Sequence, residues 1–551
     1  MRRLLMFIIG AIIFTNGYSQ KADTKYSEKL KLEVGAYGLK IAGADNSKIY
    51  FFEKKEKVNI GAFFGGAVSS IIAKISTFNK ATLEFVAERD YKKELKGNEF
   101  YDIQYLNDRL FLFCTSNARK DKGLIVSGFE IDKQTLAPKS ELKEIASFDF
   151  DEKIEFPGKS ILPSGDSNHF VIATALNKKI ASVGIGIIDL NLNSVAKTIL
   201  TLPADRESFY LYSIYCTKLQ KLIIAGSQSE ELQVGKKKSM VYKTAIIQAY
   251  DKTGKKLYTI TNNKDGNALL TPILKELPGN KLLIAGFYTT DVLSRKFEGV
   301  LAKQINLEDG SVISNNYTSF SLEQKKGNAA TTVALENILA DNSYIIKSLN
   351  FIQDKRSIII VAESYSEMAS SRMERTVTGV TKTIERADMY YKNILLLDVD
   401  VNGVINWITI VPKNQVEQVM NSSPARVGNI WHEADYCFAT NAAYYGSFKT
   451  QFASDRLYLF VNDNAGNTNV VSLSQKAKDL KGAISLRPFL LSCDYKSGVI
   501  TRKELTDDTD DTVPLFPKGL FMDNSLYFPT RSHTGFDISR FSYKIGKVEI
   551  K

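Results

Sequence analysis

Short apolar runs, each preceded by a polar turn, recur along the whole chain. They are rich in β-branched and aromatic residues and too short for ordinary helices, a pattern typical of strands. The runs begin at Ile49, Leu110, Phe170, Leu222, Leu282, Ile358, Leu457 and Leu526. Five of the seven intervals between these starts span 52 to 69 residues, and the other two, of 76 and 99 residues, contain insertions.

A second pattern repeats in step with the first. An apolar strand leads to an Asp or Asn, then to a polar or glycine-containing turn, and then to another apolar strand. The Asp or Asn of each copy is Asn79, Asp132, Asp189, Asp251, Asn306, Asp400 or Asp494, and "FSYKIGKVEI" at the end completes the series. Such a turn between two β-branched runs is the sequence signal of a β-hairpin.

One copy, "LLLDVDVNGVINW", also has the spacing that opens a helix-loop-helix calcium loop. Asp398, Asp400 and Asn402 precede Gly403 there. A calcium loop of that type needs flanking helices and a bidentate acid at its twelfth position, which here is Thr409. The flanks are strand-like instead. We therefore interpret the segment as a turn, in which the acid accepts backbone N–H groups and glycine supplies a positive φ.

Two consecutive hairpins per repeat amount to four antiparallel strands, and repeats of this length predict an all-β fold, a β-propeller of four-stranded antiparallel blades. A single blade cannot bury both of its faces, whereas a closed ring covers them all. We expect eight blades, or seven if the first and last units merge into one. The propeller is expected to be a single domain over residues 30–551, after an N-terminal leader at 20–29.

The N-terminus has the pattern of a secretory signal peptide. Arg2 and Arg3 precede an apolar run from Leu4 to Phe14, and cleavage is expected near Ser19–Gln20, so residues 1–19 would be removed. The run is too short to span a bilayer, and no longer one follows. The expected cleavage site has no cysteine, so the sequence does not indicate a lipid anchor. We expect an exported protein, periplasmic or associated with the outer membrane.

Composition agrees with a globular chain, which is 44% hydrophobic and 24% charged. The formal charge of +11 falls to +9 without Arg2 and Arg3, and the basic residues are mixed with acids along the chain. This distribution favours a solvated surface over a nucleic-acid groove. None of the four cysteines has CxxC spacing, which argues against a zinc knuckle. Buried free thiols are the expectation, because Cys114 and Cys216 lie in strand-like runs.

The turns around Asp251 and Asp400 resemble those of quinoprotein-type propeller repeats, in which a tryptophan after the turn docks adjacent blades. Trp407 fills that position once, and Tyr258 stands in for it in another copy. The Asn-Gly-x-x-x-Trp turn is also similar to repeats of secreted bacterial propellers. The segments "NWITIVPKNQ" and "AAYYGSF" resemble uncharacterised exported propeller proteins of the Bacteroidetes type.

A quinoprotein dehydrogenase would imply a quinone, a bound calcium and often a Cys-Cys pair. This chain has no Cys-Cys pair and only two tryptophans, so we expect no cofactor. The resemblance extends to the propeller lipoprotein that scaffolds outer-membrane protein assembly, although the lipidated cysteine of that protein is missing here. That similarity concerns architecture and does not transfer the task.

In such a blade, with strands a to d counted outward, the a–b and c–d turns lie on one face of the ring. The b–c loops and blade-to-blade connections lie on the other, where we expect insertions at 321–343, 364–391, 412–446 and 461–483. An acidic connection, "TDDTDDT", also lies there. Loops on a rigid scaffold carry binding function, so this loop-rich face is the predicted partner site.

The candidate binding residues lie within two of these insertions. Aromatic side chains suit protein interfaces and sugar stacking, although these residues could equally pack the insertion onto the ring. The candidates are Trp431, His432, Tyr436, Tyr444, Tyr445, Arg372 and Arg375. A weaker calcium candidate consists of Asp507, Asp508, Asp510 and Asp511, for which an exposed acidic loop is the preferred interpretation.

Catalytic motifs are scarce in the sequence. There are only three histidines, and His169, which leads a repeated strand, is interpreted as structural. No nucleophile elbow, zinc-protease motif or phosphate loop occurs. The expected function is a non-enzymatic cell-envelope interaction or scaffold protein with a protein partner. The alternatives are a carbohydrate-active hydrolase, whose paired acids would come from distant blades, and a module that binds a glycan or small ligand.

Overall fold

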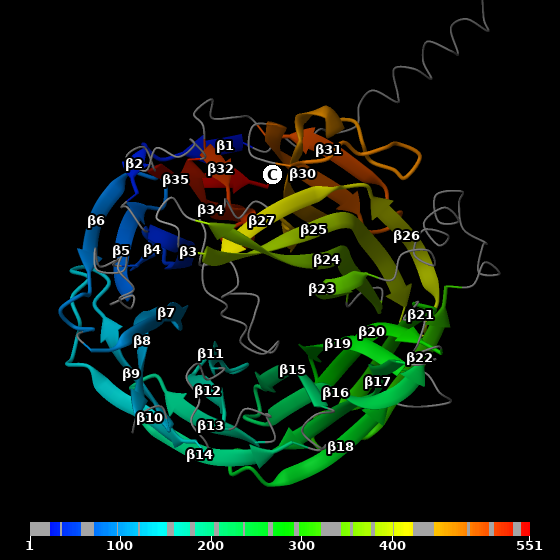
Figure 1. The fold of residues 1–551 in the computed structure, drawn as a ribbon, viewed down its shortest axis with the longest axis horizontal. Helices are drawn as coiled ribbons and strands as arrows, with labels where there is room; N and C mark the ends of the chain where they lie inside the picture. The colour runs from blue at the N-terminus through cyan, green and yellow to red at the C-terminus, as the bar shows by residue number, and fades with distance from the viewer. Residues whose placement is uncertain are drawn as a thin grey trace, which may run out of the picture.

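Eight antiparallel sheets surround a common axis in the computed structural model, and the predicted eight-bladed propeller is confirmed (Figure 1). In each sheet the first strand lies innermost and the fourth outermost. The structure describes residues 23–32, 36–56, 71–95, 97–118, 122–150, 159–176, 182–202, 209–234, 237–262, 268–290, 297–320, 343–352, 356–375, 381–400, 402–421, 446–453, 455–481, 485–505, 512–532 and 542–550.

The first four blades are regular four-stranded meanders. Blade 1 consists of β3 (Ala36–Ala44), β4 (Lys48–Glu56), β5 (Ile71–Asn79) and β6 (Phe85–Asp90). Blade 2 consists of β7 (Glu99–Leu106), β8 (Arg109–Ala118), β9 (Gly123–Ile131) and β10 (Lys143–Asp149). Blade 3 consists of β11 (Lys159–Pro163), β12 (His169–Ala175), β13 (Ser182–Asp189) and β14 (Ser194–Thr201). Blade 4 consists of β15 (Phe209–Cys216), β16 (Leu222–Val234), β17 (Lys237–Tyr250) and β18 (Lys256–Asn262).

The later blades carry additional strands. Blade 5 consists of β19 (Ala268–Leu277), β20 (Lys281–Thr289), β21 (Gly299–Asn306) and β22 (Val312–Ser319). Blade 6 consists of β23 (Tyr344–Ile352), β24 (Ser357–Arg375), β25 (Thr381–Asp400), β26 (Ile405–Val411) and β27 (Gln415–Asn421). Blade 7 consists of β28 (Phe448–Ala453), β29 (Arg456–Asn464), β30 (Leu486–Asp494) and β31 (Ile500–Glu504), with the 3-10 helix η3 (Ala465–Asn467). Blade 8 consists of β32 (Thr512–Pro514), β33 (Leu520–Met522), β34 (Ser525–Ser532), β35 (Ser542–Glu549), β1 (Asp23–Tyr26) and β2 (Leu30–Lys31), with the 3-10 helix η5 (Phe516–Lys518).

The second strand of every blade is one of the apolar runs found in the sequence. Side chains of a strand alternate between its two faces, and in a ring both faces of a blade pack on a neighbour. On β20, Leu282 and Ile284 face blade 4, whereas Leu283 and Ala285 face blade 6. The runs are therefore continuous rather than alternating. Large core clusters of this kind fill the eight junctions between consecutive blades.

The repeated Asp or Asn organises the turn between the third and fourth strands. At blade 6, Asp400 Oδ1 accepts hydrogen bonds from the backbone N–H groups of Asn402 and Val404, both at 2.8 Å, and Gly403 has φ +86°. Asp251 and Asp494 accept equivalent bonds in blades 4 and 7. The prediction of a turn at 398–403 is therefore confirmed, since the segment joins β25 to β26.

Trp407 on β26 docks blade 6 onto the corresponding turn of blade 7. Its indole Nε1 donates a hydrogen bond to the carbonyl oxygen of Tyr495 at 2.9 Å. The ring lies over Gly498, which has φ +69°, and a Cβ at that glycine would be 2.6 Å from the indole. Glycine is needed here both for the backbone conformation and for the close approach.

Three other junctions use the same contact between an outer strand and the next turn. Tyr258 on β18 donates to the carbonyl oxygen of Leu307 at 3.1 Å, as Trp407 does to Tyr495. The matching glycines are Gly254 in blade 4, Gly310 in blade 5 and Gly403 in blade 6. A Cβ added at these positions would meet Thr198, Tyr258 and Thr318, respectively. The repeat in the sequence thus encodes how one blade locks to the next.

The N-terminal segment closes the ring. β1 pairs with β35 from Asp23 opposite Glu549 to Tyr26 opposite Gly546, and β2 continues along the same strand. Between them, Ser27 Oγ accepts a hydrogen bond from Ile545 N at 3.0 Å. The last blade therefore combines strands from both ends of the chain. The propeller begins earlier than the expected start at residue 30, because part of the expected leader is a strand.

The cysteines within the described residues are buried thiols. Cys114, Cys216 and Cys493 are free, as predicted for the first two, and burial raises the pKa of each to about 12. Cys437 lies outside the described residues, and so does the predicted signal peptide.

Candidate functional site

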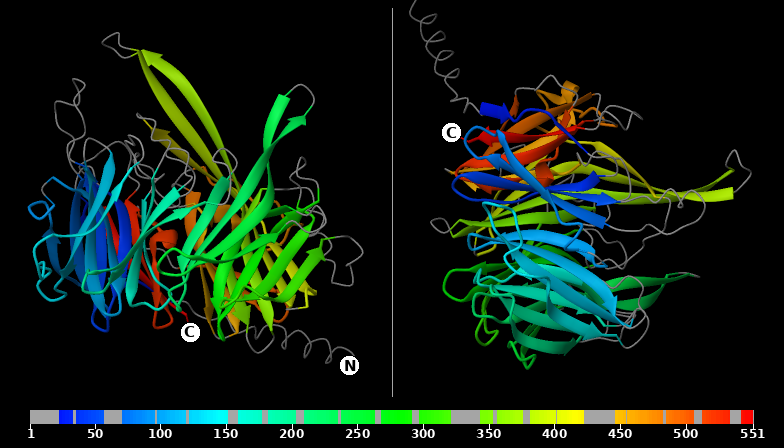
Figure 2. Two further views of the ribbon diagram at one scale, coloured as in Figure 1. Left: turned by 90° about the horizontal axis from the view of Figure 1, so that it is seen from below. Right: turned by 90° about the vertical axis from the view of Figure 1, so that its left-hand side faces the viewer.

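Two hairpins rise from one face of the ring, opposite the short turns (Figure 2). They are β16–β17 in blade 4 and β24–β25 in blade 6, and each is a connection between the second and third strands. This is the loop-rich face of the sequence analysis. The 364–391 insertion is thus not an irregular loop but a continuation of two blade strands.

The blade 6 hairpin is a regular antiparallel ladder well beyond the ring. Ser364 is the last residue of β24 that pairs with β23, and the pairing with β25 then runs from Tyr365 opposite Tyr391 to Arg375 opposite Thr381. In an antiparallel ladder, residues that lie opposite each other exchange backbone N–H···O=C hydrogen bonds. The two strands of the hairpin therefore supply each other's hydrogen bonds and do not depend on the ring for them. Seen down the axis, it extends from blade 6 across the ring toward blades 8 and 1 (Figure 1).

A third strand supports this hairpin. β27 pairs with the outer part of β25, from Gln415 opposite Tyr391 to Asn421 opposite Glu385. It follows β26 along the same edge of β25 after an interruption at 412–414. Pro412 has no N–H group to donate, which explains why the ladder breaks there. The projecting sheet is therefore three-stranded, with β25 in the centre.

The blade 4 hairpin extends beyond its neighbours in the same way. β15 pairs with β16 only as far as Gln228, and β18 with β17 only from Ala245. The pairing of β16 with β17 continues to Val234 opposite Lys237. The sequence analysis did not identify this extension, because "SEELQVGKKKSMVY" lengthens the repeat by only a few residues. The sequence signal that could have revealed the extension is a pair of long polar stretches on either side of Gly235.

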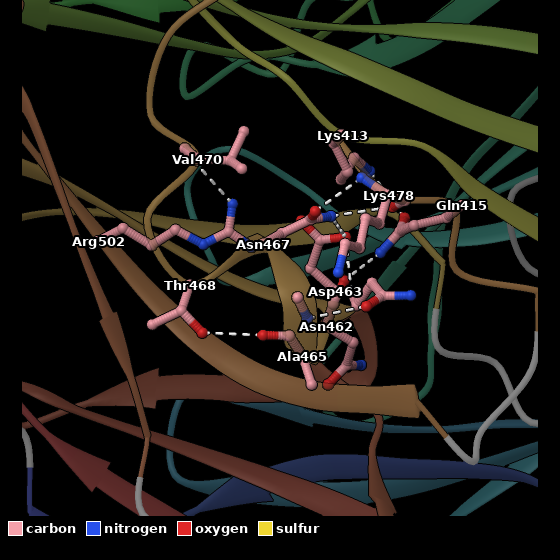
Figure 3. Close-up of polar contacts among 12 residues, drawn as sticks. Lys413, Gln415, Asn462, Asp463, Ala465, Asn467, Thr468, Val470, Lys478 and Arg502 are labelled. Atoms are coloured by element: carbon pink, nitrogen blue, oxygen red, sulfur yellow. Dashed lines mark hydrogen bonds and ion pairs between the residues drawn. The ribbon is translucent and has the colours of Figure 1, made fainter. Parts of the chain in front are cut away.

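The base of the blade 6 sheet is fixed by what we call the polar cluster: Glu363, Lys413, Gln415, Asn462, Asp463, Asn467 and Arg502. All seven are buried. The members come from β24, β27, β29, β31, η3 and the 412–414 break, so the cluster joins blade 6 to blade 7 (Figure 3).

Lys413 forms a buried ion pair at one end of the polar cluster. Its Nζ bonds Glu363 Oε1 and donates to Gln415 Oε1 at 2.8 Å, with the rings of Tyr391 and Phe448 each 5.8 Å away. The two charged side chains are 1% and 0% exposed. Burial lowers the pKa of Lys413, and the charge of Glu363 acts in the opposite direction. A pair this deep fixes geometry and cannot meet a substrate.

Gln415 connects this pair to the next two blades. Its Oε1 also accepts from Ser447 N at 3.0 Å, and its Nε2 donates to the carbonyl oxygen of Asn462. Asn462 Nδ2 in turn donates to the carbonyl oxygen of Pro514 at 2.7 Å. One chain of hydrogen bonds therefore runs from blade 6 through blade 7 to blade 8.

Asp463 holds the other end of the polar cluster. Its Oδ2 accepts from Arg502 Nη2 at 2.6 Å and its Oδ1 from Asn467 Nδ2 at 2.9 Å. The guanidinium carbon of Arg502 lies 4.1 Å from the centroid of the Phe489 ring. Asn467 Oδ1 accepts from Lys478 N at 2.7 Å, which folds the 465–481 connection back on itself (Figure 3).

The same connection lies beside β27. Leu480 N donates to the carbonyl oxygen of Asn414 at 2.8 Å, and Val416 N to that of Leu480 at 2.9 Å. These bonds make a short parallel bridge between Gln415 and Leu480. The 461–483 insertion therefore supports the root of the projecting sheet rather than standing apart from it.

The predicted binding residues are only partly placed by the structure. Arg372 and Arg375 belong to the outer part of β24, with backbones opposite Ile384 and Thr381. Five predicted aromatic and histidine residues, the four acidic calcium candidates and most of the 321–343 insertion lie outside the described residues. They are Trp431, His432, Tyr436, Tyr444, Tyr445, Asp507, Asp508, Asp510 and Asp511.

His169 is the first residue of β12, the strand that it leads in the sequence. Its Nδ1 lies 2.9 Å from Asp166 Oδ2, and Asp166 Oδ1 also bonds Ser164 Oγ. The carboxylate, not the imidazole, contacts the hydroxyl, so the trio lacks the order of a nucleophilic triad. Within the described part of the chain no three His, Cys, Asp or Glu side chains are grouped to hold a metal ion.

The polar cluster was missed in the sequence because its residues are types normally found on surfaces. A weak signal exists: "IIIVAES" and "YLFVNDN" place Glu363 and Asp463 where an apolar strand meets the loop-rich face. Among the described residues, no helix has the length and apolar character needed to cross a bilayer.

No protein-family model matches the sequence, and no curated protein does so either. Several solved structures are similar to the chain. A protein of unknown function from Bacteroides caccae is 13% identical, with 61% of this chain and 89% of that chain covered and a TM-score of 0.26. The β-propeller domain of the Trilobed protease from Pyrococcus furiosus is 10% identical, with coverages of 86% and 99% and a TM-score of 0.34.

A prolyl endopeptidase is 8% identical, with a TM-score of 0.37. The match covers 92% of this chain but only 55% of the endopeptidase, so this protein spans about half of that enzyme's length. At these identities the likeness concerns the fold alone.

Proposed function

We propose that this chain is an exported cell-envelope interaction protein that presents its loop-rich face to a protein partner. The observation that carries the proposal is the projecting sheet of blade 6, held at its root by the polar cluster. The signal-peptide pattern of residues 1–19 supports export, and with it a periplasmic or outer-membrane location.

A projecting sheet of this kind suits recognition. Among the described side chains, none from the outer parts of β24 and β25 belongs to a core cluster between the blades. Their ladder and the pairing of β27 with β25 order the sheet before any partner arrives. A preordered element loses less conformational entropy on binding than a loose loop. The two outer edges of a three-stranded sheet also offer backbone groups to an added strand.

The hydrolase alternative has no comparable observation in its favour. The carboxylates on the described innermost strands are Glu99, Asp102 and Glu276. Glu99 lies 3.5 Å from Lys159, Asp102 lies 3.2 Å from Lys40, and Glu276 accepts from Tyr215 at 2.8 Å. Paired acids across a sugar would need to converge with each other instead.

Shortening the blade 6 hairpin should release the partner. In one variant Asn-Gly replaces residues 372–384, leaving Ser371 opposite Glu385, and in a second it replaces 230–241 in blade 4. Both cuts keep every strand that the blades share. The tagged native protein, recovered from its own envelope in mild detergent, should bring down a stoichiometric partner identified by mass spectrometry. The blade 6 variant should recover at least about tenfold less of it.

The blade 4 variant is the matched control for a shortened hairpin on the same face. Unchanged far-ultraviolet circular dichroism would show that both rings are intact. Recovery of the wild-type protein alone and at monomer size would argue against the partner. Equal recovery from both shortened variants would place the partner elsewhere on the molecule.

A further inference from the structure

The projecting sheet of blade 6 has two edges, and they differ in what already occupies them. β27 forms one edge and is short, from Gln415 to Asn421. Its outer side is already bonded near the ring, because Val416 N donates to the carbonyl oxygen of Leu480. β24 forms the other edge, and beyond Tyr365 no strand among the described residues pairs with that side of it. The open edge is therefore the stretch of β24 from Ser366 to Arg375, which we call the β24 edge.

A hydrogen bond at the root of the hairpin determines which backbone groups point out of the β24 edge. Tyr365 N donates to the carbonyl oxygen of Ser343 at 3.0 Å, so this N–H points away from β25. In an antiparallel ladder, residues whose backbone groups bond the partner strand alternate with residues whose groups point away from it. The pairing with β25 has no register shift beyond Tyr365. The outward groups therefore belong to Glu367, Ala369, Ser371, Met373 and Arg375.

The far edge of the sheet gives the same alternation independently. Val416 N points away from β25, so the backbone groups of its neighbour Gln415 point toward β25. Gln415 lies opposite Tyr391, and Tyr391 lies opposite Tyr365. The N–H of Tyr391 thus points toward β27, and that of Tyr365 points away from β25, in agreement with its bond to Ser343.

The β24 edge lacks three devices by which proteins protect an exposed strand from pairing. These devices are lysines, prolines and bulges. The sequence of the β24 edge, "SEMASSRMER", has no lysine or proline, and its ladder with β25 has no bulge. The blade 4 hairpin differs, because β17 contains Lys237, Lys238 and Lys243 and a register shift follows Gln228 on β16. Of the two projecting hairpins, that of blade 6 is therefore the one suited to pairing.

We propose that the β24 edge takes up an extended segment of the partner protein as an added strand. This docking mode rests on the proposed function and deepens it, since it names the edge and the kind of partner segment. Outward N–H and C=O groups at every second residue match the period of another β-strand, which a glycan or a lipid headgroup does not have. The β24 edge has two glutamates and two arginines, so recognition should depend on the backbone of the segment more than on its charge.

Ser371→Pro tests this docking mode, because it removes one outward N–H while the bonds to β25 use the alternate residues. The tagged native protein is recovered from its own envelope in mild detergent, and its stoichiometric partner is quantified by mass spectrometry. Ser371→Pro should recover at least about tenfold less partner than wild type. Ser371→Ala is the matched control, which keeps the N–H and should recover as much as wild type. Met373→Pro, at the next outward residue, is a second variant.

Hydrogen–deuterium exchange, resolved by residue, shows the state of the edge itself. In the purified wild-type protein, the N–H of Ser371 should exchange fast, whereas those of Ser370 and Arg372, which bond β25, should exchange slowly. In the recovered complex, exchange at Ser371 should slow by at least about tenfold. Slow exchange at Ser370 and Arg372 in Ser371→Pro would show that the hairpin is intact in that variant.

Unchanged recovery of the partner by Ser371→Pro with an intact hairpin would overturn strand addition and leave the proposed function standing. No partner from wild type would overturn the proposed function, and strand addition with it. Slow exchange at Ser371 in the purified protein would also overturn strand addition by a partner, because the edge would already be covered. Light scattering would then distinguish a second copy, which doubles the mass, from another segment of the same chain.

Discussion

Glu363→Gln is expected to lower the free energy of unfolding by about 3–5 kcal/mol. The substitution keeps the shape of the side chain but leaves Lys413 buried without the negative charge of its partner, beside the neutral acceptor Gln415 Oε1 at 2.8 Å. A buried ammonium group that loses its partner bears the full cost of desolvation. Equilibrium urea denaturation of wild type and variant measures the difference.

The double substitution Glu363→Leu with Lys413→Met is the informative control. Removing both charges together should recover most of the loss, because the pair itself contributes little net stability once its desolvation is included. A loss below about 1 kcal/mol for Glu363→Gln alone would show that water reaches the pair. The polar cluster would then not be the dry anchor of the projecting sheet.

Trp407→Ala should cost a similar amount, about 3–5 kcal/mol. The substitution empties the space that the indole fills above Gly498 and removes the hydrogen bond to the carbonyl oxygen of Tyr495. Trp407→Phe should cost less, because a ring still covers the turn while the bond is lost. Chemical denaturation measures both variants.

The fluorescence of the same residue gives an independent check. The chain has two tryptophans, so a Trp431→Phe background leaves Trp407 as the sole indole fluorophore. Trp407 is 5% exposed, and its emission should be blue-shifted in the native state and shift red on unfolding. Gly498→Val should displace the ring, because its Cβ would lie 2.6 Å from the indole and its φ is +69°. Native emission typical of a solvated indole would contradict the docking.

Much of the propeller could be predicted from the sequence because its physics is local and repeated. The apolar runs are continuous since each second strand packs on two neighbours, as Leu282 and Leu283 do. The Asp or Asn of each turn accepts its own backbone N–H groups, so the turn is recognisable without knowing the fold. Blade number, strand identity and the loop-rich face follow from these two patterns.

The rest depends on contacts between distant segments. Lys413 and Glu363 are charged and 50 residues apart, and nothing in the sequence indicates that they meet in a dry core. β1 resembles a leader because its partner strand, β35, lies at the other end of the chain. The blade 4 hairpin was missed because polar strands that project into solvent lack the apolar alternation by which strands are identified.

The measurement that tests the central claim most directly is site-specific photocrosslinking in the native cell. A photoreactive amino acid is placed at Met368, on the blade 6 hairpin, and in a matched variant at Val499, beside a short turn on the opposite face. The two side chains are 62% and 60% exposed, so they differ in place and not in access to solvent. We expect irradiation to give one discrete adduct of higher mass from position 368 and none from position 499. Adducts of equal intensity from both positions, or none from 368, would contradict a partner on the loop-rich face.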